Sequence, residues 1–547
     1  MFALLAQAAL ICGASCVVWK FIRHNLVRST LDNLPGPPSP SLLYGERRLA
    51  CCGCNGWDFH RGLGEKYGPA VLLHGKFGRK LLYIFDPKAM HTIAVKEQYI
   101  YDEAHWFLRI MKATLGPGLL ATTGDEHRRQ RKLLNPAFNI NHMRDMIPIF
   151  YDVTHKLRLA IERSITDGPA EIDMVNWMGR TTLEVMGQAG LGYSFDPLVE
   201  DSTDSYGTAL KMFSPALYVF AGYLQFFTYI EAIVPASLRR TVAEWLLHGN
   251  FQKLRQMVDT MHDRSVQVFR EKRAALERGD EGLKQQLGEG KDIMSILLRA
   301  NLTANVEDRL PEDQLIGQMS TLTIAAMDTT SNALSMILYL LAKHPSAQAR
   351  LRQEIVDAQA GGKESRLGYD DLVSLPYLDA VCRETLRLYA PAPFRFRETR
   401  EDVVLPLSAP IRGRDGKMIT EIPLPKDTTI LVGVMSSNTS KALWGDDAYE
   451  WKPERWLSPL PEAVTEAKIP GVYSHLMTFW GGGRACIGFK FSQLEMKVLL
   501  STLISTFNFE LTEKPIHWNL AGVVYSTVGA DPRPALPMKV SLVKRTG

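Results

Sequence analysis

The sequence predicts a mainly α-helical protein with small β-sheets, an α+β fold, preceded by a transmembrane helix at its N-terminus. Three observations predict this architecture. Apolar residues recur with the helical period through most of the chain, alternating runs typical of strands are few and short, and no charged residue occurs before Lys20. With 547 residues, of which 46% are hydrophobic and 22% charged, the chain can bury a large core.

The N-terminus predicts a membrane anchor. Phe2 to Trp19 is an uncharged run of 18 residues, about the minimum for a helix that crosses a bilayer. The cations Lys20, Arg23 and Arg28 follow this run, whereas a cleaved signal peptide usually carries its positive charge before the apolar run. We therefore expect residues 1–19 to form an uncleaved, single-pass anchor, with the rest of the chain on the cytoplasmic side.

A stiff spacer is predicted after the anchor. Residues 20–45 are basic and proline-rich, and "LPGPPSP" at Leu34 to Pro40 combines fixed φ angles with missing N–H donors. No further Gly/Ser-rich or Pro-rich linker interrupts the sequence. Residues 46–547 are therefore predicted to form one large domain.

This domain is predicted to begin with a β-hairpin and to continue mainly as helices. Alternating apolar residues in Ala70 to Phe85, with Gly75 and Gly78 between two short runs, predict the hairpin. Lys272 to Lys291 is charged and contains glycine, so a solvated loop is expected there. The helical period predicts helices at Glu126–Leu134, Met143–Ile165, Asn250–Arg278, Glu312–Lys343, Ser346–Ala360, Tyr377–Leu388 and Phe489–Phe507, and short strands are predicted at Ile411–Pro423, Thr428–Val434 and Gly522–Val528.

The charge and the cysteines exclude two classes of protein. The net charge of +4 is spread along the chain without basic runs that alternate with aromatic residues, so no nucleic-acid partner is expected. Seven cysteines are too few and too scattered for a disulfide scaffold, and they indicate a reducing compartment. The group "CCGC" at Cys51 to Cys54 lacks a second pair at zinc-ligand spacing, so we interpret it as thiols of a surface loop.

One long apolar segment contains a single charge. Gln314 to Ala342 carries only Asp328, and its many Ser, Thr, Asn and Gln residues make it too polar for a second membrane span, so a buried helix is expected. A buried carboxylate needs a polar partner or a task. The adjacent Thr329 offers a hydroxyl, although a helical threonine commonly donates to a carbonyl of its own helix.

Glu384 and Arg387 form a second candidate group. Residues three apart share a helix face, and such pairs are common on protein surfaces. Here the flanking sequence is apolar, and Arg455 in "WKPERWL" belongs to a proline-containing segment that could dock on the pair. These three charges are therefore expected to form a structural group.

Cys486 in "FWGGGRACIG" is the third candidate. It lies just before an amphipathic helix, whose N-terminal N–H groups, together with Arg484, favour a thiolate. The glycine-rich loop fits neither the G-x-G-x-x-G nor the Walker pattern for phosphate. From these residues alone, a thiolate ligand and a nucleophile with a histidine base both stay open.

The loop around Cys486 resembles the haem-thiolate loop of the cytochrome P450 superfamily. That loop has the pattern F-x-x-G-x-R-x-C-x-G, and this chain matches it at every fixed position. The matching residues are Phe479, Gly482, Arg484, Cys486 and Gly488.

Three further matches follow the order of the same family. Glu384 and Arg387 fit its E-x-x-R helix, Arg455 fits its P-E-R segment, and Ala325 to Thr329 fit its oxygen-activating helix. The resemblance covers nearly the whole chain and looks like the microsomal, fungal-type branch. It implies the P450 fold, with residues 46–547 as the catalytic domain.

Two positions depart from the family pattern. Ala326 stands where the family usually has glycine, which would narrow the groove beside bound oxygen. His127 stands where a tryptophan is common, and with Arg131 four residues further on it could still donate to a haem propionate. Neither departure changes the class that the resemblance implies.

The resemblance implies haem b as cofactor, with the Cys486 thiolate as axial ligand of the iron and as the electron donor that favours O–O cleavage. Arg484 and Arg131 would pair with the propionates. The loop glycines Gly482, Gly483 and Gly488 would let the backbone approach the porphyrin.

The catalytic residues that the resemblance implies are Asp328 and Thr329. Asp328 would relay protons from solvent, and the Thr329 hydroxyl would hold oxygen by a hydrogen bond. The reaction class is monooxygenation, in which one oxygen atom of O2 enters the substrate.

Electrons must come from another protein, because the chain has no flavin or nicotinamide segment. The resemblance implies an NADPH-cytochrome P450 reductase, a flavoprotein, with cytochrome b5 as a candidate second donor, at the endoplasmic reticulum membrane. Basic residues would steer the acidic reductase surface, namely Arg128, Arg129, Lys132, Lys490 and Lys497.

The expected substrate is lipophilic and enters from the membrane side. Met212 to Ile230 is uncharged and rich in aromatics, and His105 to Leu120 adds bulky apolar residues; in the family these regions form the roof and wall of the pocket. The resemblance to the fungal branch of the family favours a terpenoid of secondary metabolism as the substrate. The alternatives are a fatty-acid or aromatic-xenobiotic hydroxylase, a haem-thiolate isomerase and a non-catalytic haem-binding protein.

Overall fold

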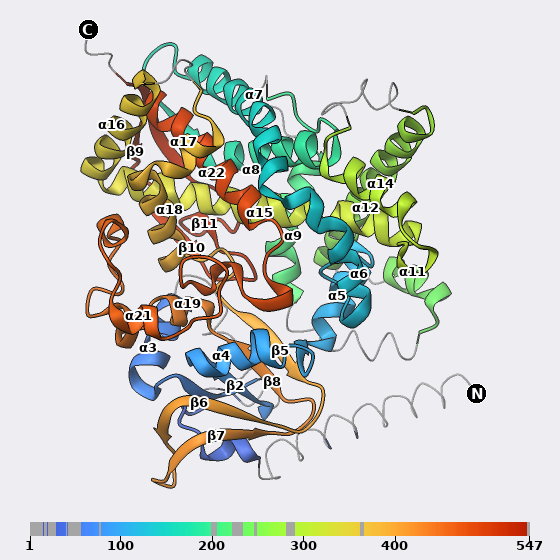
Figure 1. Ribbon diagram of the computed structural model, residues 1–547, viewed down its shortest axis with the longest axis vertical. Helices are drawn as coiled ribbons and strands as arrows, with labels where there is room; N and C mark the ends of the chain where they lie inside the picture. Colours follow the sequence, from blue (N-terminus) through green and yellow to red (C-terminus); the bar gives the residue numbers. More distant parts are fainter. Residues whose placement is uncertain are drawn as a thin grey trace. The chain divides into compact units, whose positions relative to one another are not determined.

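The computed structural model describes residues 29–39, 56–75, 78–198, 205–220, 234–245, 249–279, 290–361 and 366–543, together with the single residues 15, 19 and 41. The predicted anchor at 1–19 therefore lies outside the described residues, apart from positions 15 and 19, as does the group Cys51 to Cys54. The chain forms two compact units. The helix-dominated composition with small sheets confirms the predicted fold class (Figure 1).

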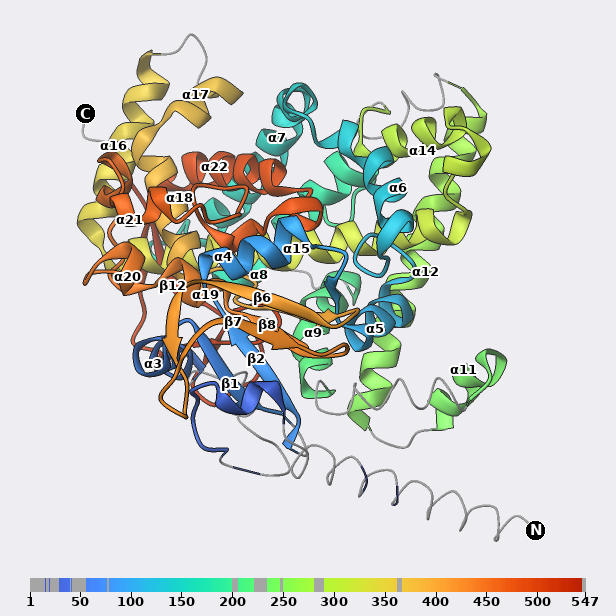
Figure 2. The ribbon, with the colours of Figure 1, turned by 60° about the horizontal axis from the view of Figure 1, so that its bottom comes forward.

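Unit 1 comprises Met1–Ala104, Phe394–Ala448 and Pro461–Arg484. Its core is a five-stranded sheet in the order β1-β2-β8-β5-β3. The hairpin predicted at Ala70 to Phe85 is confirmed as antiparallel β1 (Ala70–His74) and β2 (Lys80–Ile84). β2 then pairs in parallel with β8 (Thr429–Val432), a strand more than 300 residues later, so that blue and orange strands lie side by side in Figure 2. β8 pairs with β5 (Arg395–Thr399), and β5 with β3 (Tyr101–Glu103).

The helices in the described part of unit 1 are short. They are the 3-10 turn η1 (Thr30–Asn33), α3 (Gly56–Tyr67), α4 (Pro87–His91), the π-turn η4 (Thr92–Lys96), α19 (Val434–Asn438), α20 (Lys441–Trp444), α21 (Glu462–Glu466), η9 (Met477–Phe479) and η10 (Gly482–Arg484).

The predicted hinge is partly packed onto unit 1. The Leu34 side chain is buried, and Pro35 accepts a hydrogen bond from the Leu72 N–H of β1 at 2.8 Å. An added Cβ on Gly36 would collide with the Leu72 carbonyl. The first residues of the proline segment are thus held at the sheet, because a proline carbonyl can still accept where its nitrogen cannot donate.

The strand predicted at Ile411–Pro423 is wrong in its bounds. The chain turns between Gly413 and Gly416 and forms the antiparallel hairpin β6 (Val403–Arg412) and β7 (Met418–Leu424). Gly416 adopts a φ of 82°, which favours glycine. The "GRDG" sequence at Gly413 to Gly416 is a turn signal that marks this reversal.

Unit 2 comprises His105–Pro393, Tyr449–Leu460 and Ala485–Gly547 and is mostly helical. Its long central helix, α15 (Glu312–Lys343), packs against α8 (Met174–Val185), α9 (Ser205–Phe220), α12 (Gly249–Glu277), α18 (Pro376–Leu388) and α22 (Phe489–Thr506) (Figure 1). Acidic Glu312 and Asp313 in its first turn and Lys343 in its last turn complement the helix dipole.

The remaining helices of unit 2 are α5 (His105–Leu115), α6 (Gly124–Leu134), α7 (Ile140–Ser164), α11 (Ala236–Trp245), α14 (Ile293–Thr303), α16 (Pro345–Gly361) and α17 (Tyr369–Ser374), with the turns η5 (Asn135–Phe138), η6 (Met186–Leu191), η7 (Val306–Asp308) and η8 (Pro453–Leu457). A three-stranded antiparallel sheet joins β4 (Ala170–Asp173), β12 (Pro537–Leu542) and β9 (Phe507–Leu511), and a second hairpin pairs β10 (Ile516–Asn519) with β11 (Tyr525–Val528).

The loop predicted at Lys272 to Lys291 is wrong at its start. Helix α12 continues to Glu277, and Lys272 is buried in an ion pair with Asp292 at 2.8 Å. A lysine can be buried in this way when a carboxylate offsets its charge. Residues 280–289 lie outside the described part of the chain.

Among the described residues, one helix is long and apolar enough to cross a membrane, and it is α15. About 78% of its apolar window is buried inside the structure, as expected for a core helix. The buried helix predicted at Gln314 to Ala342 is therefore confirmed.

Candidate active site

Helix α15 has one accessible face in the middle of its buried length. Ala325, Ala326 and Thr329 are partly accessible, whereas their neighbours Ile324, Met327, Asp328 and Thr330 are buried. Positions i, i+1 and i+4 share one side of a helix. Two small side chains and one hydroxyl therefore form an open strip in an otherwise packed helix.

The hydroxyl of Thr329 is bonded to its own helix. It donates to the Ala325 carbonyl at 2.7 Å, the back-bond that a helical threonine commonly makes. Because its single proton is used there, the hydroxyl oxygen is left to accept a hydrogen bond from an O–H group on the accessible face. In this geometry the hydroxyl acts as an acceptor toward the site.

The carboxylate of Asp328 is buried and held by side chains. Ser214 donates to its Oδ2 at 2.6 Å, Asn332 donates to its Oδ1 at 3.0 Å, and Lys211 forms an ion pair with Oδ1 at 3.5 Å. A buried carboxylate was expected to have polar partners, and the structure supplies them from two places. Lys211 and Ser214 lie on α9, more than 100 residues earlier in the chain, and Asn332 lies one turn further along α15.

Cys486 lies exposed in the turn that leads into α22, and Gly488 is the N-cap residue of that helix. Arg131 of α6 donates to the carbonyl of Ala485 at 2.5 Å, so this arginine holds the residue next to the cysteine. Behind the loop, Phe491 of α22 packs edge-on against Phe150 of α7, with ring centroids 4.9 Å apart. The thiol therefore sits on a turn supported by three helices.

A row of glutamines joins α6 to α15. Gln130 donates to Gln314 at 3.0 Å and accepts from Gln318 at 2.8 Å, and all three side chains are buried. His127 and Arg131, four residues apart on α6, lie on the helix that this row fastens. This row of glutamines was not predicted, because its only signal in the sequence is three glutamines in otherwise helical segments.

The glycines before Cys486 have packing roles within unit 1. Gly482 adopts a φ of 62°, and an added Cβ would collide with the carbonyl of Ala94 in η4. The N–H of Gly483 donates to Gln98 Oε1 at 2.8 Å, which fastens the loop to the residues after η4. An added Cβ on Gly488 would meet only Phe138 at 3.8 Å, which is ordinary contact.

Two arginines of unit 1 pair with carboxylates, and Arg397 among them is buried. Arg484 pairs with Asp102 at 3.4 Å, and Arg397 pairs with Glu103 at 2.6 Å and lies over the ring of Trp480 at 4.6 Å. Burial lowers the pKa of Arg484, and Arg397 nearby lowers it further, while Glu103 and Asp102 oppose the shift. Arg397 was not among the predicted residues, because a single arginine in a strand belongs to no motif. Phe479, the first residue of the loop motif, packs edge-on against Tyr473.

The structure brings Glu384, Arg387 and Arg455 together. Glu384 and Arg387 are fully buried and share two hydrogen bonds of 2.8 Å, and Arg455 approaches Glu384 at 3.4 Å. The same carboxylate accepts from the Trp456 indole at 2.9 Å and from the Lys452 N–H at 3.1 Å. Through these contacts with Lys452, Arg455 and Trp456, the Glu384 carboxylate holds the segment 451–456 against α18.

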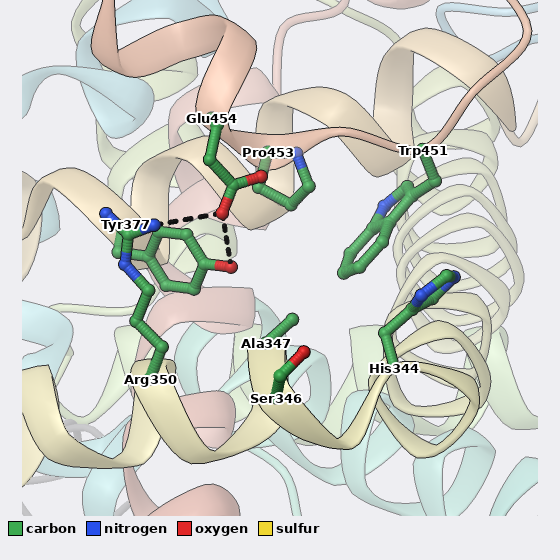
Figure 3. Close-up of a pocket in the computed structure, with 8 residues that line it drawn as sticks. All are labelled: His344, Ser346, Ala347, Arg350, Tyr377, Trp451, Pro453 and Glu454. Carbon is green, nitrogen blue, oxygen red and sulfur yellow. Dashed lines mark hydrogen bonds and ion pairs between the residues drawn. The ribbon is translucent and has the colours of Figure 1, made fainter.

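An open pocket of about 320 Å³ lies beside this segment (Figure 3). On one side Glu454 accepts from Arg350 at 2.9 Å and from the Tyr377 hydroxyl at 3.1 Å. On the other side the rings of Trp451 and His344 stack, with centroids 5.1 Å apart. Burial and Glu454 raise the pKa of Tyr377 to about 12, so its hydroxyl stays a donor at neutral pH. These contacts fasten η8 to α16 and α18.

The basic residues predicted to steer a partner do not all reach the surface. Arg128, Arg129 and Lys132 are exposed on α6, and Lys490 is partly exposed. Lys497 is buried and pairs with Asp379 at 2.8 Å, so its predicted role in steering was wrong. Lys497 lies on the side of α22 that packs against the rest of the unit. A lysine in a predicted helix is usually assigned to the exposed side, so its burial could not be predicted from the sequence.

Comparison with known proteins identifies the family. The sequence model described as Cytochrome P450 matches residues 35–528. The chain belongs to the cytochrome P450 family. Cytochrome P450 monooxygenase 91 of Postia placenta is 52% identical over 537 residues, which cover 98% of each chain. The ganoderic acid synthetase of Ganoderma lucidum is 49% identical over 541 residues, 97% of each chain, and the cytochrome P450 monooxygenase eriI of Hericium erinaceus is 38% identical over 551 residues, 99% of this chain and 98% of the relative.

The protein is therefore a cytochrome P450 monooxygenase, an oxidoreductase, and the family implies haem iron and electrons from a redox partner. The side chains of this P450 suit a haem. Cys486 presents an exposed thiol, and the small side chains Ala325 and Ala326 are partly accessible on α15, so within unit 2 a flat group could approach the helix there.

Proposed function

We propose that this P450 is a membrane-anchored, haem-thiolate monooxygenase that inserts one oxygen atom of O2 into a terpenoid of fungal secondary metabolism. The observation that carries the proposal is the accessible face of α15, because it lies beside a large apolar cluster. Ile324 and Met327, which flank the accessible residues, belong to that cluster. A reactive centre at this face would meet hydrocarbon rather than polar groups.

The cluster supplies the wall of the proposed substrate site. It joins α5, α9, α12 and α15, and several large side chains at its edge are only partly buried. The members include Ile110, Met111, Tyr206, Leu210, Phe213 and Met261, with Trp106, Phe107, Leu120 and Leu217 packed against them. Of the predicted roof, Met212 to Ile230, the structure describes residues 212–220. The ganoderic acid synthetase relative supports a terpenoid over a fatty acid or an aromatic xenobiotic.

In this proposal the Cys486 thiolate would be the ligand of the haem iron, and Arg484, Arg131 and His127 would hold the propionates. When bound, the haem supplies the redox chemistry that activates dioxygen. Arg131 would serve two purposes, because it already fixes the carbonyl of Ala485 beside the ligand.

The proton chemistry falls to Asp328 and Thr329. The Thr329 oxygen accepts a hydrogen bond on the accessible face, since its own proton is engaged with Ala325. Asp328 takes up protons on the buried side of the same helix turn, after its partners exchange for water. Together they would deliver protons to one side of the site while the apolar cluster excludes water from the other.

The electrons are proposed to come from NADPH through a flavoprotein reductase, with cytochrome b5 as a second donor, at the endoplasmic reticulum membrane. The uncharged run at Phe2 to Trp19 supports the anchor. Helix α11 adds support, because Leu238, Val242 and Trp245 lie on one face of it and are 53%, 39% and 78% exposed. An apolar face of this kind beside arginines suits the membrane interface.

Binding titrations test the substrate class. The Soret shift of the ferric protein should saturate at low micromolar concentrations of tri- or sesquiterpenoids, because apolar burial dominates the binding free energy. Small polar amines and acids of similar ring number serve as the control. Tight shifts with the polar compounds and none with terpenoids, fatty acids or polycyclic aromatics would overturn the proposal, whereas saturation with fatty acids alone would favour the alternative hydroxylase.

Replacing Thr329 with alanine should leave haem content and terpenoid binding unchanged and divert NADPH electrons to hydrogen peroxide. We expect product per NADPH to fall by about tenfold or more, because the acceptor on the accessible face is lost. The measurement compares NADPH, peroxide and product in a reconstituted system. Thr330→Ala is the matched control, since Thr330 is buried on the other side of the helix. Equal coupling in the Thr329 variant and the wild type would contradict the role.

The same reconstitution separates the two remaining alternatives. A non-catalytic haem protein would consume no NADPH when substrate is added, and a haem-thiolate isomerase would convert a peroxide without reductase. Substrate-dependent NADPH consumption with an oxygenated product is the expected result.

A further inference from the structure

A chain of amide groups runs from the loop after α5 to a partly exposed carboxylate on α6. The Leu119 N–H donates to Gln318 Oε1 at 3.1 Å, and Gln318 Nε2 donates to Gln130 Oε1 at 2.8 Å. Gln130 Nε2 then donates to Gln314 Oε1 at 3.0 Å, and Gln314 Nε2 donates to Glu126 Oε1 at 2.5 Å. We call these five residues the amide chain.

All the hydrogen bonds of the amide chain run in one direction. An ionised carboxylate can only accept, so Glu126 fixes the direction of the amide that binds to it, and each glutamine in turn fixes the next. Hydrogen bonds in series polarise one another, and a negative charge at the accepting end strengthens the whole series. The Leu119 N–H therefore responds to the charge of Glu126, although three glutamines separate the two groups.

Gln130 is the junction of the amide chain, and its side chain makes every hydrogen bond of which an amide is capable. Its Nε2 donates to Gln314 and to the Pro117 carbonyl, the latter at 2.9 Å. Its Oε1 accepts from Gln318 and from the Thr122 hydroxyl, the latter at 3.2 Å. An amide has two donor hydrogens and two acceptor lone pairs. Because Gln130 is fully buried, loss of any partner would leave a buried polar group unsatisfied.

The loop that the amide chain holds, residues 117–122, lies directly on the backbone of α15. An added Cβ on Gly118 would stand 2.4 Å from the Gly317 carbonyl oxygen, and one on Gly317 would stand 2.8 Å from the Gly118 nitrogen. No side chain separates the two backbones at this point. The position of the loop along α15 is therefore set by its hydrogen bonds to the amide chain.

The same loop forms part of the proposed substrate wall. Ala121 belongs to the apolar cluster, and Leu120 packs against it. On α15, Gln318 lies seven residues before Ala325 and eleven before Thr329, and these spacings put all three on one face of a helix. The amide chain thus holds the loop on the side of α15 that carries the accessible residues.

We propose that the three glutamines of the amide chain are positioning residues that hold loop 117–122 against the substrate. The carboxylate of Glu126 tightens this hold from the partly exposed end of the chain. The proposal rests on the proposed monooxygenase function and on the apolar cluster as its substrate wall. A loop held in one position leaves a terpenoid fewer orientations at the accessible face of α15. The amide chain therefore affects both the affinity for substrate and the choice of the carbon atom that is oxidised.

Hydrogen exchange of the ferric holoenzyme, measured by mass spectrometry on peptides that cover residues 117–122, tests the proposal without turnover. Gln318→Leu removes the acceptor of the Leu119 N–H, so exchange in this loop should become about tenfold faster or more. Glu126→Gln removes only the charge and should accelerate exchange in the same peptides by a smaller factor, about two- to threefold. Unchanged exchange in Gln318→Leu would overturn the proposal, and unchanged exchange in Glu126→Gln would remove the role of the charge.

Substrate binding and the product ratio give the functional half of the test. In Gln318→Leu, the terpenoid concentration for a half-maximal Soret shift should rise by about fivefold or more, and the ratio of hydroxylated isomers should change. Gln314→Leu should give a smaller change in the same direction, and it carries the test if Gln318→Leu does not accumulate. The double variant Gln318→Leu/Glu126→Gln should be no worse than Gln318→Leu, because both residues act through one chain.

Gln348→Leu is the matched control. Gln348 is a buried glutamine on α16 that donates to the carbonyls of Leu341 and Phe509 at 3.2 Å and 3.0 Å. Its replacement also leaves buried backbone groups without a partner, so it should cost a similar amount of stability. Exchange in residues 117–122, the Soret shift and the product ratio should keep their wild-type values. If Gln348→Leu changes them as much as Gln318→Leu does, the effect is a general loss of stability and the proposal is wrong.

The positioning role and the proposed function fail differently. If no terpenoid shifts the Soret band of the wild type, the substrate class is wrong whatever the variants show. If terpenoids bind and are hydroxylated, but Gln318→Leu and Glu126→Gln keep the wild-type exchange, affinity and product ratio, only the positioning role is lost.

Discussion

Replacement of Cys486 with serine is expected to abolish the red-shifted Soret band of the ferrous carbon-monoxide complex and with it all monooxygenase activity. A serine hydroxyl is not deprotonated at neutral pH and donates far less electron density than a thiolate. The loop should otherwise keep its form, because its supports are the Arg131 contact to Ala485 and the packing of Phe491 on Phe150. The variant should therefore accumulate with reduced haem content.

A matched control separates ligation from a general effect of losing a thiol. Cys382 is buried on α18, and burial raises its pKa to about 12, so it stays a neutral thiol at neutral pH. Cys382→Ala should keep the red-shifted band with a small loss of stability, roughly 1–2 kcal/mol for a buried small side chain. An unchanged band in Cys486→Ser would remove this residue as the ligand.

Removal of either member of the Glu384–Arg387 pair is expected to abolish haem incorporation. Both side chains are fully buried, and truncation of one strands the other charge at a cost of about 3–5 kcal/mol. Glu384→Ala should be the more severe change, because it leaves both Arg387 and Arg455 without this carboxylate and also removes the acceptor of the Trp456 indole. Haem content per protein and the melting temperature are the measurements.

The control for this pair is a helical ion pair nearer the surface. Arg158 and Glu162 on α7 lie 3.1 Å apart with side chains about 30% exposed, so Arg158→Ala should cost no more than about 1 kcal/mol and retain full haem content. If Glu384→Ala or Arg387→Ala purifies with as much haem as Arg158→Ala, the buried pair does not support the cofactor.

The helices predicted from periodicity are confirmed, including α15, most of whose residues are buried, and several with one buried and one exposed face. α6, α7, α12 and α16 are of this kind, and their bounds differ from the predicted ones by a few residues. α8 was not predicted; eleven of its twelve residues are buried, including the charged Arg180 and Glu184, so its polar residues do not mark a side that faces solvent. Its start is instead defined by Asp173, whose carboxylate caps the helix N-terminus.

Contacts between residues that are distant in the sequence cannot be predicted from periodicity. In the sequence Lys272 is one of many charged residues in its segment. In the structure it is buried, because Asp292, the N-cap residue of α14, forms an ion pair with it. The two strands of the β6–β7 hairpin look like one, because the turn between them is short and apolar residues continue on both sides. In each case the decisive neighbour is distant in sequence or hidden by a turn.

The residues of the candidate site also fall into two groups, local motifs that could be predicted and distant partners that could not. The loop around Cys486, the Glu384–Arg387 helix and Asp328–Thr329 are local motifs, so the sequence contains them in full. The partners that hold them are not local: Lys211 and Ser214 reach Asp328 from α9, and Arg131 reaches the cysteine loop from α6. Gly482 was predicted as a loop glycine, but its packing against Ala94 required the fold.

Oxygen incorporation from isotopically labelled dioxygen tests the central claim most directly. The full-length protein is reconstituted with a flavoprotein reductase, NADPH and a terpenoid that gives a saturating Soret shift, and the product is analysed by mass spectrometry. The account predicts a hydroxylated product that carries one labelled oxygen atom, with no label when heavy water replaces labelled dioxygen, and no product with Cys486→Ser. A product whose new oxygen comes from water, or one that forms equally without dioxygen and NADPH, would contradict it.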